Sequence, residues 1–180
     1  MSKPPHPMVL EVIGRDYTYD PDTGVISKQG KSVGTRRDRD YVRVRVRITF
    51  PDCLALECDC KAHLIAWYLT YGEWAPGKVD HIDGDPTNNR LDNLRVATSE
   101  QNSHNMRKLT TRQTSSQYKG VSYHKRNGKW IARIVYQGKK RHLGTYTTEE
   151  EAARSYDLAA HRLFGRFAKL NFPLLPTKFP

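Results

Sequence analysis

Cysteine is scarce: this chain of 180 residues has three, Cys53, Cys58 and Cys60. Three thiols cannot all pair within one chain, and a bridge between the closely spaced Cys58 and Cys60 would be strained. With His63 they could supply four zinc ligands, but structural zinc sites usually come as two separated pairs with two to four residues inside each pair. We therefore expect a reducing compartment, no zinc, and a strand that carries thiols.

Long apolar runs are also missing. No stretch of 18 apolar residues is present, which excludes a membrane-spanning helix, and Met1 to Pro7 lacks the apolar core of a secretion signal. Hydrophobic residues at 37% and aromatic residues at 10% are nevertheless too frequent for a disordered chain. We expect a soluble, folded protein of the cytoplasm with no membrane partner.

Acidic side chains are fewer than basic ones: the chain has 19 Asp and Glu and 30 Lys and Arg, so its formal net charge is +11. The imbalance lies in one part of the chain, because residues 1–106 hold 14 basic and 15 acidic side chains while residues 107–180 hold 16 and 4. Such an excess indicates an anionic partner. Residues 108–116 are polar, rich in Ser and Thr and without apolar periodicity, and we interpret them as a linker between two small domains.

The first domain is expected to be rich in strands. Tyr17 to Lys28 predicts a hairpin around an Asp-Pro-Asp-Thr-Gly turn. Tyr41 to Phe50 alternates Val and Ile with arginine in the period-2 pattern of a half-buried strand. Its arginine face could contact phosphates or could simply be solvated. His63 to Leu69 predicts a short buried helix, with His63 as a packing or capping residue.

Residues 78–107 have the order strand, turn-rich loop, strand and helix. Val79 to Ile82 and Leu94 to Ala97 are typical of short strands, and an Asp-Gly-Asp-Pro sequence marks the turn after the first of them. Thr98 and Gln101 form a capping box that opens the helix. The segment therefore predicts a ββα unit.

Polar residues of this unit form an ordered pattern: Asp80-His81, then Asn93 twelve residues after the histidine, then Asn102 nine residues later. The pattern resembles the HNH endonucleases, in particular the homing endonucleases of bacteriophages and introns, in which Asp-His replaces the first His-His. The resemblance covers about residues 80–105. It implies an HNH nuclease domain over residues 1–107 and metal-dependent hydrolysis of phosphodiester bonds in double-stranded DNA.

Hydrolysis of a phosphodiester needs a base for the water, charge relief on the phosphoryl oxygens and help for the leaving oxygen. Histidine exchanges protons near neutral pH, so we assign His81 as the general base. Asp80 and Asn102 offer hard oxygen ligands for Mg²⁺, with Mn²⁺ as a substitute. By resemblance, Asn93 hydrogen-bonds across the loop and holds His81 in register. Asn105, one helical turn from Asn102, is a second candidate for the metal or phosphate.

Strand geometry sets a requirement for this site. Adjacent residues of a strand point to opposite faces, so Asp80 and His81 can serve one site only where the strand bends into its loop. His104 should point away from the face of Asn102. The other polar loop residues are expected to cap backbone groups, as they do in most turns. They are Asp83, Asp85, Asn88 and Asn89.

The basic second domain is predicted to hold three strands and a helix. The strands are expected at 118–124, 129–136 and 140–146, and a capping box at Thr147 opens a helix that stops at Gly165. Alternation in the middle strand places two sets of residues on opposite faces. The set that should meet the helix is Trp130, Ala132, Ile134 and Tyr136, and the set on the open face is Lys129, Ile131, Arg133 and Val135.

Residues 117–173 resemble the APETALA/ethylene-response-factor DNA-binding domain, through the sequences Tyr-Lys-Gly-Val at 118–121, His-Leu-Gly-Thr-Tyr at 142–146 and Leu-Asn-Phe-Pro at 170–173. The resemblance implies that the open sheet face lies in the DNA major groove. Ser122, Val135 and His142 stand where plant members usually carry arginine or tryptophan, so only the docking mode carries over. The expected DNA-binding residues are Lys119, Ser122, His124, Lys125, Arg126, Lys129, Arg133, Lys140, Arg141 and His142.

Together these patterns predict an α+β protein: a strand-rich scaffold with a ββα nuclease unit, a linker, a three-stranded antiparallel sheet packed on one helix, and a tail at 174–180. The expected function is that of a homing-type HNH endonuclease, acting in the bacterial cytoplasm if it is encoded by a phage. One alternative is a DNA-binding regulator with a non-cleaving HNH-like domain, and another, from charge alone, is an RNA-binding protein. Residues 1–75 could buttress the site or add arginine contacts.

Overall fold

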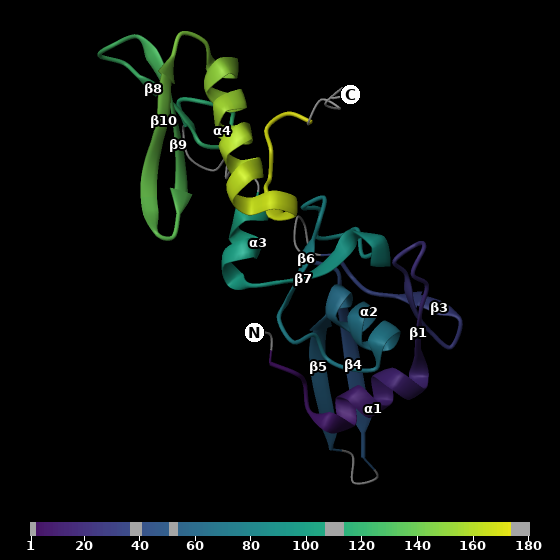
Figure 1. Ribbon diagram of the computed structural model, residues 1–180. Coiled ribbons are helices and arrows are strands. Elements are labelled where there is room, and N and C mark those ends of the chain that lie inside the picture. The colour runs from purple at the N-terminus through teal and green to yellow at the C-terminus, as the bar shows by residue number, and fades with distance from the viewer. Residues whose placement is uncertain (1–2, 37–40, 51–53, 107–113, 174–180) are drawn as a thin grey trace, which may run out of the picture. The chain divides into compact units, whose positions relative to one another are not determined.

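The computed structural model describes residues 3–36, 41–50, 54–106 and 114–173 (Figure 1). The chain divides into two compact units, Met1–Glu100 and Gln101–Pro180, and both mix helices with strands as predicted. None of the described helices is long and apolar enough to cross a membrane. Cys53, most of the predicted linker and the predicted tail lie outside the described residues.

The first unit opens with helix α1, Pro7–Asp16, which the sequence patterns did not predict. A proline is tolerated in the first turn because its missing N–H would have no partner there. The His6 side chain caps the helix by accepting a hydrogen bond from Met8 N at 3.3 Å. Val9 and Ile13, one turn apart, are buried and anchor α1 to the core.

A small three-stranded sheet follows α1. The predicted hairpin is confirmed: β1, Tyr17–Tyr19, pairs antiparallel with β2, Ile26–Lys28, and β3, Lys31–Val33, lies on the other side of β2. Asp20 Oδ1 accepts hydrogen bonds from two backbone N–H groups of the turn, which is how an aspartate stabilises such a reversal.

A longer hairpin pairs β4, Arg43–Thr49, with β5, Ala55–Lys61, and α2, Ala62–Tyr71, follows directly. The predicted alternation of β4 is confirmed, with Val44 and Val46 buried. Its arginine face is partly neutralised by partners on β5, because Arg43 lies 3.2 Å from Asp59 and Arg47 lies 3.5 Å from Glu57. Each of these exposed pairs contributes at most about 1 kcal/mol.

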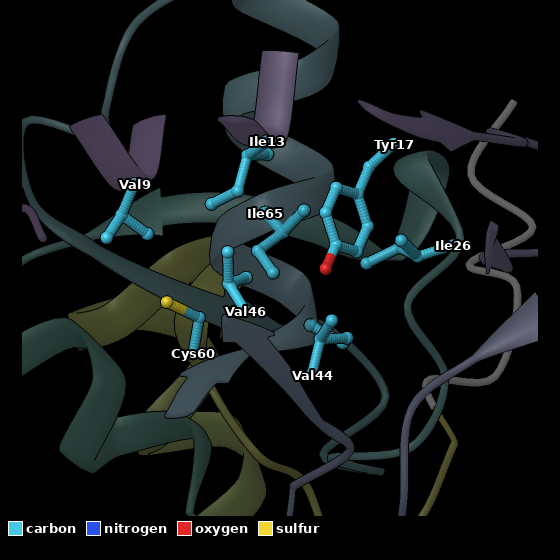
Figure 2. Close-up of a cluster of buried hydrophobic side chains, with 9 residues drawn as sticks. Val9, Ile13, Tyr17, Ile26, Val44, Val46, Cys60 and Ile65 are labelled. Atoms are coloured by element: carbon cyan, nitrogen blue, oxygen red, sulfur yellow. The ribbon is translucent and has the colours of Figure 1, made fainter. Parts of the chain in front are cut away.

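The core of the first unit forms between α1, β4 and α2. Figure 2 shows Ile13 of α1, Val46 of β4 and Ile65 of α2 pointing toward one another. Full burial of such a side chain stabilises the fold by about 1.5–3 kcal/mol. Tyr17 of β1 and Ile26 of β2 join this cluster and tie the small sheet to it.

The predicted ββα unit is present. Strand β6, Lys78–His81, pairs antiparallel with β7, Leu94–Ala97, and the loop between them ends in the 3₁₀ turn η1, Leu91–Asn93. Helix α3, Ser99–Asn105, begins two residues after β7 and crosses from the first unit into the second.

The second unit is a sheet packed on one helix, as predicted. Strands β8, Val121–His124, β9, Lys129–Tyr136, and β10, Lys139–Tyr146, form an antiparallel sheet in the order β10-β9-β8. Helix α4, Glu149–Phe164, lies across one face (Figure 1), and the 3₁₀ turn η2, Gly165–Phe167, follows it.

Small residues let α4 lie close to the sheet. Ala132 packs with Ala152 and Ala153, and Ile134 packs with Tyr156 and Ala160. The capping box that opens α4 uses Thr148 and Glu151, one residue later than predicted. Gly120 is required at its position, because its φ is 77° and a Cβ atom there would lie 2.0 Å from the ring of Tyr156.

Candidate functional site

Asp80 and His81 are the last two residues of β6, where the strand meets the loop to β7. Asp80 lies opposite Arg95 in the strand pairing, and both side chains are almost fully buried. The Arg95 guanidinium donates to Asp80 Oδ2 from Nε at 3.0 Å and from Nη2 at 2.9 Å. Asp80 is therefore one half of a buried ion pair.

Asn93 holds the loop together from its far end. Its Oδ1 accepts a hydrogen bond from Asp83 N at 3.0 Å, and its Nδ2 donates to Asp83 Oδ1 at 3.0 Å and to Asn88 O at 2.8 Å. Ile82 N, next to His81, donates to Asn93 O at 2.9 Å. These bonds run across the loop, and the catalytic role of Asn93 stays a prediction.

Asp83, Asp85 and Asn88 act as turn residues, as predicted. Asp83 Oδ1 accepts a bond from Asp85 N at 2.7 Å, and Asp85 Oδ1 accepts one from Thr87 N at 2.9 Å. Burial alone would raise the pKa of Asp83, but the hydrogen bonds from Asp85, Asn88 and Asn93 outweigh it and hold that pKa below its usual value. The loop beside His81 is thus fixed by an ionised carboxylate.

Asn89 has a role that its turn sequence did not predict. Its Oδ1 lies 3.0 Å from His81 Nε2, and its Nδ2 donates to Thr87 O at 3.4 Å, which sets the orientation of the amide. An amide oxygen can only accept, so this bond requires the proton of a neutral His81 to sit on Nε2. The proton-accepting atom of His81 is then Nδ1.

Two aromatic rings pack against His81. The His63 ring, from the first turn of α2, meets it edge-on, with centroids 4.9 Å apart and an interplanar angle of 82°. The Tyr41 ring lies 4.9 Å from His63 and 5.9 Å from His81. His63 is a packing residue, as predicted, but the ring that it packs on is that of the predicted base.

His63 should make the protein sensitive to acid. Burial, and then the charges of His81 and Lys61, lower its pKa to about 3, and no described group bonds its Nδ1. The unfolded chain binds a proton near pH 6.5 and the folded chain does not, so stability falls as the pH drops below 6.5. Between pH 6.5 and pH 4.5 we expect a loss of about 2–3 kcal/mol from this group.

Urea denaturation at the two pH values measures this loss. His63→Phe keeps a ring beside His81 but cannot take up a proton, so its two unfolding free energies should differ by about 2–3 kcal/mol less than those of the wild type. His161→Phe, on the exposed side of α4, is the matched control and should keep the full loss. Equal acid sensitivity of both variants would contradict the prediction.

The hairpin of β1 and β2 buttresses the loop of the site. The Tyr19 hydroxyl donates to Asn89 O at 2.7 Å, and Leu91 N donates to Pro21 O at 3.0 Å. Gly24 has a φ of 75°, and a Cβ atom there would lie 2.6 Å from the backbone of Asn89 and Arg90. Residues 1–75 therefore support the loop, one of the two roles considered for them, and the arginine contacts to DNA stay a prediction.

The predicted metal ligands lie in different units, Asp80 in the first and Asn102 on α3 in the second, so their joint role stays a prediction. Within the described residues, no group of three or more His, Cys, Asp and Glu side chains could hold a metal ion. The donor chemistry still fits a hard divalent cation, because a carboxylate and an amide oxygen leave positions for water and phosphate. The space beside Asp80 already accommodates the positive charge of Arg95.

The open face of the second unit gathers most of the predicted DNA-binding residues. His142 pairs with Arg133, Lys140 with Val135 and His124 with Lys129, and paired residues share a face. This face is opposite to the buried Ala132 and Ile134, so the predicted assignment of faces is confirmed. The residues on or beside it are Ser122, His124, Lys125, Arg126, Lys129, Arg133, Lys140 and His142.

Two of the predicted DNA-binding residues do not project from the open face, and their contact with DNA stays a prediction. Arg141 pairs with Ile134 on the side of α4, and its guanidinium lies 4.9 Å from the centre of the Tyr136 ring. Lys119 points its ammonium at backbone carbonyls of residues 104 and 106. Neither the family resemblance, for Lys119, nor the basic charge, for Arg141, indicated the direction of the side chain.

Comparison with known proteins matches both units. Residues 60–104 match the family described as HNH endonuclease, and residues 116–166 match the AP2 domain. Protein 3.8 of Escherichia phage T7 is 34% identical over 112 residues, which cover 62% of this chain and 90% of that protein. The chain belongs to the same family as protein 3.8, and it carries an HNH endonuclease domain over residues 60–104. Its sheet packed on a helix is an AP2 domain, as the sequence predicted.

Two further relatives are each similar to part of this chain. An uncharacterized HNH endonuclease, L560, of Acanthamoeba polyphaga mimivirus is 43% identical over 93 residues, which cover 52% of this chain and 46% of that protein. The ethylene-responsive transcription factor WRI1 of Arabidopsis thaliana is 34% identical over 105 residues, which cover 56% of this chain and 24% of the plant protein. The chain thus spans less than half the length of these two relatives.

Proposed function

We propose that the chain is a metal-dependent endonuclease that hydrolyses phosphodiester bonds of double-stranded DNA. The observation that carries the proposal is the setting of His81, a buried histidine at a strand end whose Nε2 is bonded to Asn89 Oδ1 at 3.0 Å. That bond makes Nδ1 the atom that accepts the proton of the attacking water. Asn93, Asn89 and the His63 ring keep the imidazole in one orientation.

A divalent cation would be held by Asp80 and Asn102, with Mg²⁺ the ion that these hard oxygen donors favour and Mn²⁺ a substitute. When bound, it would relieve negative charge on the phosphoryl oxygens and stabilise the leaving oxygen. Arg95 balances the charge of Asp80 and keeps the carboxylate at the end of β6.

The AP2 sheet holds the substrate. Arg133, Lys140 and His142 share its open face, and the resemblance to the APETALA/ethylene-response-factor domain implies that this face docks in the major groove. Lys125 and Arg126, in the exposed turn after β8, add phosphate contacts. The Asp-His pattern and the likeness to protein 3.8 of phage T7 support a homing-type enzyme of phage origin that acts in the bacterial cytoplasm.

One observation favours a second candidate, a DNA-binding regulator with a non-cleaving HNH domain. The Asp80 carboxylate already has a cationic partner in Arg95, and a chain that no longer binds metal could keep such a pair for stability. The two candidates differ in whether the protein cleaves any DNA.

The experiment is to incubate the purified full chain with supercoiled plasmid that carries DNA from its source, with Mg²⁺ or with EDTA. A nuclease produces open-circular DNA if it cuts one strand and linear DNA if it cuts both. Product that forms only with Mg²⁺ supports the proposal. A plasmid that is bound but never cut supports the regulator.

A further inference from the structure

The C-terminal end of α3 is held by the AP2 domain. Lys119 Nζ donates to His104 O at 2.6 Å and to Met106 O at 2.7 Å. Lys169 N donates to the same His104 carbonyl at 3.3 Å. The His104 ring stacks on Phe164 of α4, with centroids 3.6 Å apart and an interplanar angle of 10°, and Figure 1 shows α3 beside the end of α4.

These contacts are what a short helix needs at its end. The last four carbonyls of a helix have no partner within it, and the end carries a partial negative charge. A lysine ammonium supplies both hydrogen bonds and positive charge. Helix α3 has seven residues, too few to be stable alone, so its order depends on such contacts.

The backbone of Lys119 is anchored in turn. Lys119 N donates to Asn171 Oδ1 at 2.6 Å, and Asn171 Nδ2 donates to Lys119 O at 3.1 Å. Asp157 of α4 accepts bonds from the backbone N–H groups of Asn171 and Phe172 at 2.8 and 2.9 Å. A continuous chain of hydrogen bonds therefore leads from α4 to the end of α3.

We propose that Lys119 is a positioning residue that fixes the end of α3, the helix that carries Asn102, to the AP2 domain, and that it does not contact DNA. The catalytic part of this role rests on the proposed function, whereas the structural part does not. Burial, and then the charge of Lys169, lower the pKa of Lys119 to about 8, in keeping with an ammonium enclosed by protein.

The test uses the full chain and the variants Lys119→Met, which keeps the length of the side chain, and Lys119→Arg, which keeps its charge. Lys129→Met is the matched control, because Lys129 is exposed on the open sheet face. The first readout is amide hydrogen exchange of the peptide covering residues 99–106, without DNA. The second is the salt dependence of DNA binding.

We expect Lys119→Met to speed exchange in residues 99–106 about tenfold, because it removes two charged hydrogen bonds. Lys119→Arg should restore most of the protection. The slope of log affinity against log salt should be unchanged in Lys119→Met and smaller by about 0.9 in Lys129→Met. With cleavable DNA at saturation, Lys119→Met should lower the cleavage rate and leave the affinity unchanged.

Unchanged exchange in Lys119→Met, together with a slope smaller by about 0.9, would show a phosphate contact and overturn the proposal. Faster exchange in Lys129→Met as well would overturn it too, because the effect would then not be specific to Lys119. If the wild type cleaves nothing, the proposed function fails, but the exchange result still decides whether Lys119 holds α3.

Discussion

His81→Ala should lower the rate of DNA cleavage by about 10²–10⁴-fold and leave DNA affinity within about twofold. The variant removes the imidazole that accepts the proton in the proposed mechanism, whereas the open face of the AP2 sheet is untouched. Single-turnover cleavage of plasmid at saturating protein measures the rate, and gel-shift titration in EDTA measures the affinity.

His161→Ala controls for the loss of any histidine, since His161 lies on the exposed side of α4. It should cleave at the wild-type rate. Wild-type cleavage by His81→Ala would rule out His81 as the general base. If His81→Ala loses DNA affinity as well as cleavage, the substitution disturbs the protein beyond removing the imidazole.

Arg95→Ala should lower the free energy of unfolding by about 3–5 kcal/mol, which is the second large effect that we expect. The guanidinium makes two hydrogen bonds to Asp80 Oδ2, and its removal leaves a buried carboxylate without its cationic partner. Urea denaturation at neutral pH, in EDTA, measures the change.

Arg90→Ala is the matched control, because Arg90 and Asp92 form a pair at 3.4 Å in which both side chains are exposed. That variant should lose less than about 1 kcal/mol. Equal losses of unfolding free energy in Arg95→Ala and Arg90→Ala would contradict the prediction that a buried ion pair matters more for stability than an exposed one. If Asp80 is a metal ligand, Mg²⁺ should raise the urea midpoint of Arg95→Ala more than that of the wild type, because the cation can replace the guanidinium.

Spacing along the chain predicted the parts of this protein that follow a fixed period. The ββα order places Asp80 and His81 at a strand end, and alternation in β9 separates Arg133 from Ala132. Both results follow from local rules, since side chains in a strand change face at every residue. These rules also located the cap of α4 to within one residue.

Contacts between distant segments could not be predicted in this way. Asn89 has the sequence setting of a turn residue, and only the folded loop brings its amide to His81. His63 lies on a helix that precedes the site, and packing of α2 against β6 and β7 brings its ring to His81. A search for polar residues within the whole ββα loop, with each tested as a partner of His81, would have included Asn89.

The sequence also did not predict the direction in which long basic side chains point. Lys119 occupies a position where the AP2 resemblance implies a DNA contact, yet its ammonium turns to α3. Arg141 is exposed, but the pairing with Ile134 places it on the side of α4. A lysine or arginine can reach several partners from one Cα, so its charge alone does not reveal its direction.

The support of the loop by β1 and β2 bears on the order in which the protein folds. Tyr19 and Asn89, joined by a hydrogen bond, are 70 residues apart in sequence. Contacts of such long sequence separation form late, because a large loop of chain must close before they are made. On the ribosome, the hairpin emerges long before Asn89 is synthesised, so a growing chain cannot make these supporting hydrogen bonds until residues 89–91 are present. The loop that carries the predicted base therefore reaches its supported form only when the N-terminal hairpin and residues 89–91 are both present.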